Sequence, residues 1–161
     1  MKLNFDGASR GNLGRSGVGA IIRNEVGEVV RAISGLVGVA TNNVAEISVM
    51  EAGLQWCVNN GVVKLIIEGD SQVILNGVTK SVFQNWRLEC WILRINMLLN
   101  LLGDYHIQHM FQEGNKVADY LANMGVEEDS AREFGRDDTM LIGLKEIISL
   151  DMVSIPRSRI G

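Results

Sequence analysis

A chain of 161 residues, 47% of them hydrophobic, is long enough to bury a substantial core and predicts one main domain. Its longest apolar stretch, 91–102, is interrupted by an arginine and two asparagines, whereas a membrane helix needs about 20 apolar residues. Residues 1–20 lack the continuous apolar segment of a signal peptide, so we expect an intracellular, reducing compartment, with nucleus and cytoplasm left open.

The formal net charge of −4 lies mostly in the C-terminal part of the sequence. Residues 1–126 hold ten Lys and Arg against eleven Asp and Glu, whereas residues 127–161 hold five against eight. A polyanionic partner is therefore neither required nor excluded. Cys57 and Cys90 belong to no CxxC or Cys/His cluster, so they are interpreted as two buried free thiols.

Three antiparallel strands are predicted first, at 2–10, 17–24 and 28–37, joined by glycine-rich turns. Asp6 stands inside the first of them, although aspartate is depleted in strands. An Asp-Gly pair can form a hairpin turn, but here alternating apolar residues precede the pair and none follow it. Asp6 therefore needs another explanation.

Helices and further strands follow in the second part of the chain. Residues 41–43, Thr-Asn-Asn, offer capping side chains, and apolar residues at helical spacing continue to the Asn-Asn-Gly sequence at 59–61. The next predicted elements are a strand at 62–67, a short helix at 71–76, a helix at 86–102, a strand at 106–111 and a helix at 115–124. The order βββαβααβα predicts an α/β fold with a mixed sheet and helices on its faces.

We divide the chain into a main domain at residues 1–126 and a C-terminal tail at residues 127–161. The acidic sequence at 127–138 is interpreted as a solvated connector. Beyond it, an amphipathic helix that ends before Pro156 is predicted from five apolar residues, Met140, Leu141, Leu144, Ile147 and Ile148.

Four carboxylates are candidate metal ligands: Asp6, Glu46, Asp70 and Asp119. Each has a simpler explanation: Asp70 as a helix N-cap, Glu46 as a favourable charge near a helix N-terminus, and Asp119 as a solvated helix residue. The simpler explanation is weakest for Asp6. If all four converge, however, their repulsion requires cations. Oxygen ligands without His or Cys suit magnesium or manganese.

A histidine adds a candidate proton donor or acceptor. His109 follows the fifth predicted strand and stands ten residues before Asp119. A lone histidine at a strand end is more often structural, and His106 is interpreted in that way.

Five stretches together resemble one known family: FDGASRGNLG, GVGAII, TNNVAE, EGDSQVI and HMFQEGNKVADYLA. From Asn4 to Gly125 the chain resembles ribonuclease H of type 1, and it looks most like the plant domains of that family that are related to retroelement polyproteins. The resemblance implies a five-stranded mixed sheet in the order 3-2-1-4-5, flanked by helices.

The resemblance also implies roles for individual residues. Asp6, Glu46, Asp70 and Asp119 match the metal-binding and catalytic acids, and His109 matches a mobile histidine that assists proton transfer and product departure. Contacts near the RNA hydroxyls are implied for Asn12, Asn42, Asn43 and Gln72. Thr41 matches a contact to a DNA phosphate, and Asn115, which matches a helix residue near the histidine loop, is also assigned to substrate binding.

The activity implied is hydrolysis of the RNA strand of an RNA/DNA hybrid with two Mg²⁺ or Mn²⁺ ions, leaving 5′-phosphate and 3′-hydroxyl ends. Residues 73–86 contain a single basic residue, Lys80, where many relatives have a basic loop, so weak substrate binding is expected unless a fused or separate nucleic-acid-binding or reverse transcriptase domain compensates. Two alternatives remain: a domain that binds nucleic acid or protein without cutting, and a nuclease for structured DNA.

Overall fold

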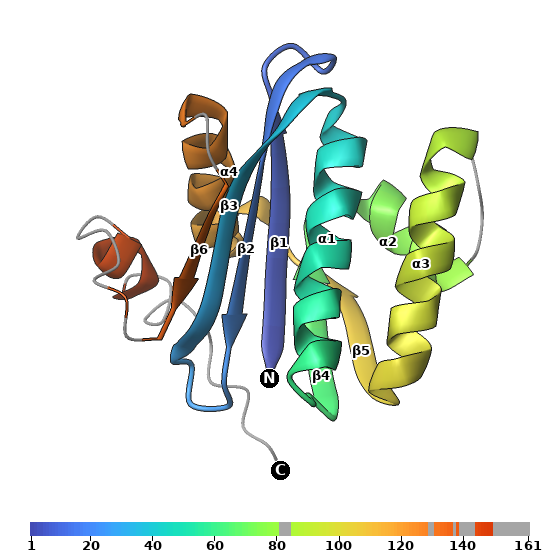
Figure 1. Cartoon of the computed structure of the whole chain (residues 1–161), viewed down its shortest axis with the longest axis vertical. Helices are drawn as coiled ribbons and strands as arrows, with labels where there is room; N and C mark the ends of the chain where they lie inside the picture. The colour runs from blue at the N-terminus through green and yellow to red at the C-terminus, as the bar shows by residue number, and fades with distance from the viewer. Residues whose placement is uncertain (81–84, 129–130, 137, 139–143, 150–161) are drawn as a thin grey trace.

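The computed structural model describes residues 1–80, 85–128, 131–136, 138 and 144–149. A six-stranded mixed sheet in the order β5-β4-β1-β2-β3-β6 forms its centre (Figure 1). The strands are β1 (Lys2–Ser9), β2 (Gly14–Arg23), β3 (Val29–Ala40), β4 (Lys64–Gly69), β5 (Asp104–His109) and β6 (Arg132–Gly135). Strands β1, β4 and β5 run parallel to one another, and the other neighbours are antiparallel.

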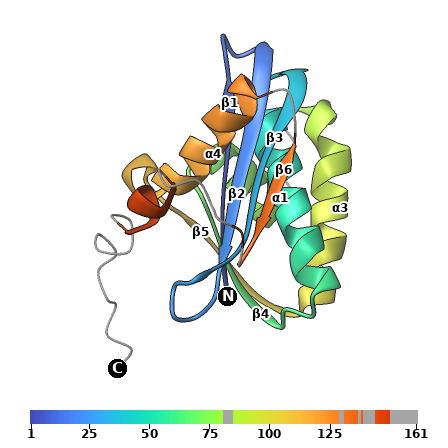
Figure 2. The same ribbon diagram turned by 60° about the vertical axis from the view of Figure 1, so that its left-hand side comes forward.

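Helices cover both faces of this sheet (Figures 1 and 2). They are α1 (Asn42–Asn59), α2 (Gln72–Lys80), α3 (Trp86–Leu102) and α4 (Lys116–Glu127), with the short 3₁₀ turn η1 (Gln112–Gly114) before α4. Helix α1 packs on β1 and β2, α3 packs on α1, and α4 lies on the opposite face over β2. Among the described residues, no helix is long and apolar enough to cross a bilayer.

The alternation of β1 divides its side chains between the two faces. Leu3 and Phe5 are buried in the larger core, beneath α1 and α3. Asn4 and Asp6 belong to the opposite face and are also buried. The strand therefore carries polar groups into the interior on the side of α4.

Glycines in β2 allow α4 to lie directly on the sheet. A Cβ at Gly19 would stand 2.2 Å from the carbonyl oxygen of Ala118, and one at Gly17 would stand 2.1 Å from that of Ala122. Because such distances are too short for any side chain, the backbone of α4 contacts the backbone of β2. This close contact sets the position of Asp119, which follows Ala118 in α4.

The predicted order of elements and the mixed sheet are confirmed, with one strand added at the edge next to β3. The interpretation of 127–138 as a solvated connector was wrong, because Arg132–Gly135 pairs with β3 as β6. The charges of β6 and its neighbour are matched by an ion pair between Arg31 and Glu133. The predicted strand at 106–111 lies two residues earlier, because Gly103 ends α3 with a φ of +83° and the pairing with β4 starts at once.

Two further predictions about the chain have different outcomes. Cys57 is buried as expected, but Cys90 is exposed on α3. Residues 144–149 are helical, which agrees with the predicted C-terminal helix, whereas Met140, Leu141 and Pro156 lie outside the described residues. Leu144 is fully buried in a second core with residues of β2 and α4. The tail thus contributes to the packing beneath α4.

We expect Leu144→Ala to lower the free energy of unfolding by about 2 to 5 kcal/mol, because it leaves a cavity in the second core. Urea unfolding measures the loss, with Leu13→Ala as the matched control, since Leu13 is 68% exposed. A change below about 0.5 kcal/mol would contradict the inclusion of the tail in the core.

Candidate active site

The candidate site lies where the pairing of two parallel strands stops. Strands β1 and β4 pair only over residues 2–4 and 66–68. Asp6 and Asp70 come two residues beyond the last pair: Asp6 lies in the second half of β1, and Asp70 directly follows β4. A crevice at such a point, where the chain connects to opposite sides of the sheet, is the usual ligand site of open α/β sheets.

Glu46 reaches the same place from α1. The Thr41 hydroxyl accepts a hydrogen bond from Val44 N at 3.3 Å and so fixes the start of this helix. A Cβ at position 7 would stand 2.6 Å from Glu46 N, so Gly7 is needed for the close approach of α1 to β1. The Asp-Gly pair therefore places one carboxylate in the strand and makes room for another on the helix.

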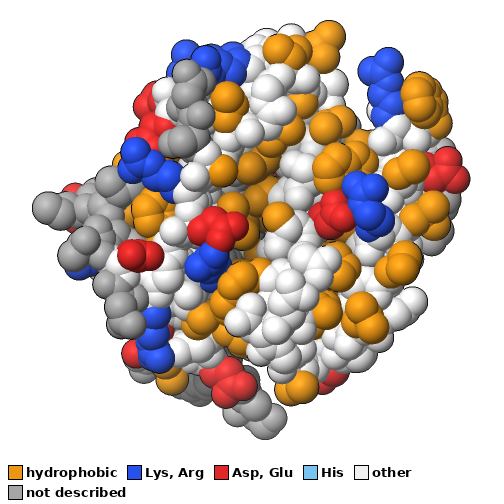
Figure 3. All heavy atoms as spheres, in the orientation of Figure 1, with side chains coloured by type: hydrophobic (Ala, Val, Ile, Leu, Met, Phe, Trp, Pro, Cys, Tyr) orange, Lys and Arg blue, Asp and Glu red, His pale blue; other side chains and the backbone are white. Residues whose placement is uncertain are grey.

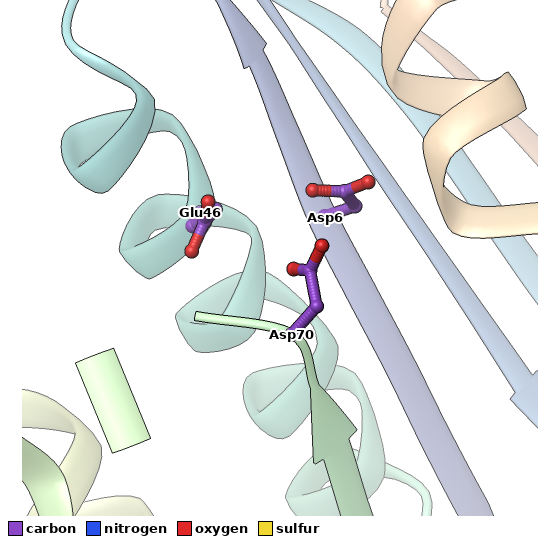
Figure 4. Close-up of side chains that lie close together, drawn as sticks. All are labelled: Asp6, Glu46 and Asp70. Carbon is purple, nitrogen blue, oxygen red and sulfur yellow. The ribbon is translucent and has the colours of Figure 1, made fainter. Parts of the chain in front are cut away.

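Asp6, Glu46 and Asp70 form a compact group (Figure 4). One carboxylate oxygen from each lies within 4.8 Å of the others. The three side chains line a pocket of about 250 Å³. An oxygen of Asp6 accepts a hydrogen bond from Gly7 N at 2.8 Å, whereas the buried Oε2 of Glu46 has no hydrogen-bond partner among the described residues.

Burial and mutual repulsion make the charged state of this group costly. Burial, followed by the charge of Asp70, raises the pKa of Asp6 to about 7. Burial raises the pKa of Glu46 to about 8, although a hydrogen bond from Ser71 acts in the other direction. Burial also raises the pKa of Asp70. Without a cation, the protein therefore retains protons on these acids at pH values where ordinary carboxylates are ionised.

Asp119 lines the same pocket from α4 but does not belong to the compact group of three. Its charge contributes to the raised pKa of both Asp6 and Asp70. Asn123, one turn further along α4, donates to an oxygen of Asp119 at 3.0 Å. Asp119 thus completes the acidic wall at the edge of the pocket.

His109 is the last residue of β5 and is exposed to solvent. Its Nε2 lies 3.0 Å from the carbonyl oxygen of Asp70. The ring of Phe111 contacts the imidazole edge to face, with 5.3 Å between ring centroids. The histidine is therefore adjacent to the acidic pocket without lining it.

The residues predicted to contact nucleic acid fall into two groups. Asn42 lines the pocket, and its backbone N–H donates to the side chain of Asn12 at 3.4 Å, in the loop before β2. Asn43 is half-buried in the first turn of α1. Gln72 is exposed and bonds to Asn76 one turn further along α2. Four of the six predicted residues therefore lie on loops or helix ends near the acids.

Thr41 and Asn115 have structural contacts. The hydroxyl of Thr41 caps α1. Asn115 is 1% exposed and donates to the carbonyl oxygen of Phe5 at 2.9 Å, so it attaches the start of α4 to β1 beside Asp6. A direct contact between Asn115 and nucleic acid, as the resemblance implied, does not agree with this burial.

The sequence interpretation missed several residues of the site. Ser71 rather than Asp70 caps α2, with its hydroxyl accepting from Ile74 N, and it also bonds to Glu46. Asn123, Ser9 and Gln112 line the pocket. Asn123 stands four residues after Asp119, which is the spacing of neighbours on a helix face, so helical periodicity was a signal for it.

The donor set fits a hard divalent cation. The three grouped side chains supply only oxygen atoms, which suits magnesium or manganese, and no thiol or imidazole lies in the group. The buried Oε2 of Glu46, which lacks a partner among the described residues, is an acceptor that a cation would satisfy. The cluster could therefore bind a metal.

Comparison with known proteins shows what the chain is similar to. The family described as "Reverse transcriptase-like" matches residues 4–125. Ribonuclease HI of Halobacterium salinarum is 34% identical over 125 residues, which cover 77% of this chain and 63% of the relative. A putative ribonuclease H protein of Arabidopsis thaliana is 29% identical over 123 residues, which cover 76% of this chain and 20% of the relative. The chain thus spans less than two thirds of each of these relatives.

Solved structures show the same fold. The RNase H1 of the halophilic archaeon Halobacterium salinarum superimposes with a TM-score of 0.74 at 33% identity, over 78% of this chain and 96% of that one. LC11-RNase H1 in complex with an RNA/DNA hybrid superimposes with a TM-score of 0.73 at 24% identity, over 78% of this chain and 96% of the other. The chain therefore belongs to the family of ribonuclease H-like domains described as reverse transcriptase-like.

Proposed function

We propose that the protein is an endonuclease that hydrolyses the RNA strand of RNA/DNA hybrids, leaving 5′-phosphate and 3′-hydroxyl ends. The observation that carries the proposal is the group of three carboxylates, from β1, α1 and the end of β4, within 4.8 Å of one another. Bringing like charges together is costly, and bound cations remove the cost. The relatives are named as ribonucleases H, and the RNA/DNA hybrid bound to LC11-RNase H1 suggests the substrate class.

Asp6, Glu46 and Asp70 would hold two divalent ions, Mg²⁺ or Mn²⁺, with Asp119 at the edge of the site. Such ions activate a water molecule and stabilise the leaving 3′ oxygen of the cleaved strand. The protein supplies carboxylates from within β1, from the end of β4 and from helices α1 and α4, so the ligands are held in place before the substrate arrives. No side chain of the protein then needs to act as a nucleophile.

Selectivity for RNA would come from amide side chains beside the pocket. Asn42 lines the pocket, and its backbone N–H donates a hydrogen bond to the side chain of Asn12. Gln72 lies on the first turn of α2. Amide groups both donate and accept hydrogen bonds, so they can recognise a 2′-hydroxyl, which DNA lacks. Asn43 is a further candidate for this contact, and Thr41 a candidate for a DNA phosphate.

His109 is proposed to assist proton transfer and product departure. Its Nε2 lies 3.0 Å from the backbone carbonyl oxygen of Asp70, one of the three grouped acids, and its side chain is exposed to solvent on the side where substrate would bind. Histidine is the side chain that most readily gains and loses a proton around neutral pH. We expect it to contribute to turnover more than to substrate binding.

Substrate affinity would depend on an additional domain. The pocket is acidic. Arg10, which follows the pocket residue Ser9, pairs with Glu127 at 3.7 Å. Contacts to phosphates supply much of the affinity for nucleic acid. A fused or separate nucleic-acid-binding or reverse transcriptase domain is therefore the proposed partner.

We expect Asp70→Asn to lower cleavage of a labelled hybrid by about 100-fold or more, because it removes a metal ligand from the group. The assay contains Mg²⁺ or Mn²⁺, with a chelator arm and with duplex RNA and duplex DNA as parallel substrates. Asp104→Asn is the matched control, since this carboxylate is exposed at the start of β5. No cleavage of hybrid by the parent protein would favour a binding module, preferred cleavage of DNA would favour another nuclease, and cleavage that survives Asp70→Asn would indicate a contaminant.

For His109→Ala, the expected result is a fall in kcat of about 10- to 100-fold with a smaller change in KM, because general acid–base groups act on the transition state. His106→Ala is the matched control, because His106 is also exposed on β5 but lies on the other face of the strand. Steady-state kinetics on the hybrid measures both. Equal effects of the two substitutions would contradict the role of His109.

In metal-free protein, stability should fall as the pH rises from about 4 to 8. The pKa values of Asp6 and Glu46 are raised to about 7 and about 8 in the folded state, so the folded protein binds more protons than the unfolded chain in this range. The protonated acids therefore stabilise the folded state fully at pH values below the ordinary carboxylate pKa. This stabilisation is lost as the pH rises through the raised pKa values of the folded protein. The total loss is on the order of a few kcal/mol.

Thermal unfolding at several pH values measures this dependence. Asp6→Asn should flatten it and should stabilise the metal-free protein at pH 8, whereas Glu25→Gln, an exposed carboxylate in the hairpin after β2, should leave it unchanged. Millimolar Mg²⁺ should raise the stability of the parent protein at pH 8 but not at pH 5, since ligands must be ionised to bind. A pH profile that is identical in the parent and in Asp6→Asn would count against the costly acidic group.

A further inference from the structure

Helix α3 is apolar on two opposite faces. Its inner face packs on α1 and the larger core, through Leu88, Ile92, Ile95, Leu99 and Leu102. At about 100° per residue, a second set of apolar residues lies on the other side of the helix. A helix of a monomeric domain normally has one apolar face and one polar face. The second face of α3 therefore needs a partner.

We call this second face the outer stripe, and it consists of Trp86, Cys90, Leu93, Met97 and Leu101. The exposed fractions are 77% for Trp86, 54% for Leu93, 67% for Met97 and 70% for Leu101, and Cys90 is also exposed. Hydrophobic side chains are gathered on the surface over α3 (Figure 3). Within the described part of the chain, nothing covers the stripe. Contiguous apolar surface of this kind usually marks an interaction site.

The spacing of the stripe is compatible with a helix as its partner. Trp86, Cys90, Leu93 and Met97 follow one another at intervals of four, three and four residues. This alternation is the pattern of the narrow seam between two packed helices, in which each residue fits between residues of the facing helix.

The charges beside the stripe favour a second copy of α3 as the partner. Glu89 lies on one flank of the stripe, and Arg87 and Arg94 lie on the other, at about 100° per residue. When two copies run parallel, opposite flanks meet, so Glu89 faces the partner's Arg94 five residues further along. When they run antiparallel, like flanks meet and the two arginines face each other. Charge complementarity therefore favours the parallel pair.

The neighbourhood of Arg94 is compatible with this contact. Its Nε and Nη2 bind Glu51, at 2.6 and 3.3 Å. An arginine has five N–H donors in a planar fork, so Nη1 remains for a second carboxylate. The guanidinium of Arg94 also lies over the ring of Trp91, with its Cζ 4.7 Å from the ring centroid.

We propose that α3 is the seam of a homodimer in which two copies pack their outer stripes in parallel about a two-fold axis along the helix. Cys90 then faces the partner's Cys90 across this axis, and Leu93 occupies the centre of the seam. A single helix pair is smaller than a standard interface of about 1,200 to 2,000 Å², so the dimer is weak and depends on concentration. No residue of the outer stripe lines the acidic pocket, so the proposal is independent of the nuclease activity.

Sedimentation velocity over a range of protein concentrations tests the association. We expect a monomer–dimer equilibrium whose dissociation constant rises at least about tenfold in Leu93→Asp and in the milder Leu93→Ser. Val63→Asp is the matched control, because Val63 is 77% exposed and lies outside α3. Circular dichroism establishes that each variant is folded. A protein that stays monomeric at millimolar concentration, or a dimer that Leu93→Asp and Leu93→Ser leave intact, would overturn the proposal.

Oxidative cross-linking tests the parallel orientation. We expect mild oxidation to yield a disulfide-linked dimer of the parent protein that disappears in Cys90→Ser, because Cys57, the other cysteine, is buried. In an antiparallel pair, Cys90 would face Met97 instead. A dimer that forms no Cys90 cross-link, but is cross-linked in Met97→Cys and no longer cross-linked when Cys90→Ser is added to Met97→Cys, would refute the parallel arrangement.

Discussion

The electrostatic cost of placing Asp6, Glu46 and Asp70 side by side in a buried pocket governs the whole site. Folding brings the three acids together even though burial and repulsion raise the pKa of each of them. In the metal-free protein, protonation of the carboxylates lowers this cost. Bound cations would lower it by neutralising the negative charges. A fold that tolerates such a group gains a preorganised binding site for hard divalent ions.

Close contacts of backbone with backbone hold the acids in this position. Gly7 lets α1 approach β1 at Glu46, and Gly19 lets α4 approach β2 beside Asp119. Asn115 then attaches the start of α4 to β1 next to Asp6. The tail adds Leu144 to the core beneath α4. Helices on both faces are thus fixed to the central strands around a single pocket, and the rigid elements rather than the loops carry the acids.

The sequence predicted those features that depend on local pattern. The cap at Thr41, the limits of α3 and the anomalous aspartate in β1 could all be identified from residue types and spacing. The convergence of the carboxylates was only a hypothesis at the level of sequence, because it depends on contacts between segments far apart along the chain. Asn115 could not be recognised as a structural residue, since its buried contact with Phe5 joins positions 110 residues apart.

Strand β6 and Cys90 were misinterpreted for a related reason. The charges around Glu133 are typical of a solvated segment, but they pair with charges of β3 once the strand is in place. Cys90 lies in an apolar sequence that resembles a buried helix, yet only one of the two apolar faces of α3 packs within the described chain. In both cases the residue types of a surface can be seen in the sequence, but the contacts of that surface cannot.

Anomalous diffraction at the manganese absorption edge, from crystals of the protein grown with Mn²⁺, is the decisive measurement for the acidic group. We expect an anomalous peak among the carboxylates of Asp6, Glu46 and Asp70, at oxygen distances normal for this ion. A structure in which manganese binds elsewhere, or in which any two of these side chains point to different sides of the molecule, would contradict the proposed metal site.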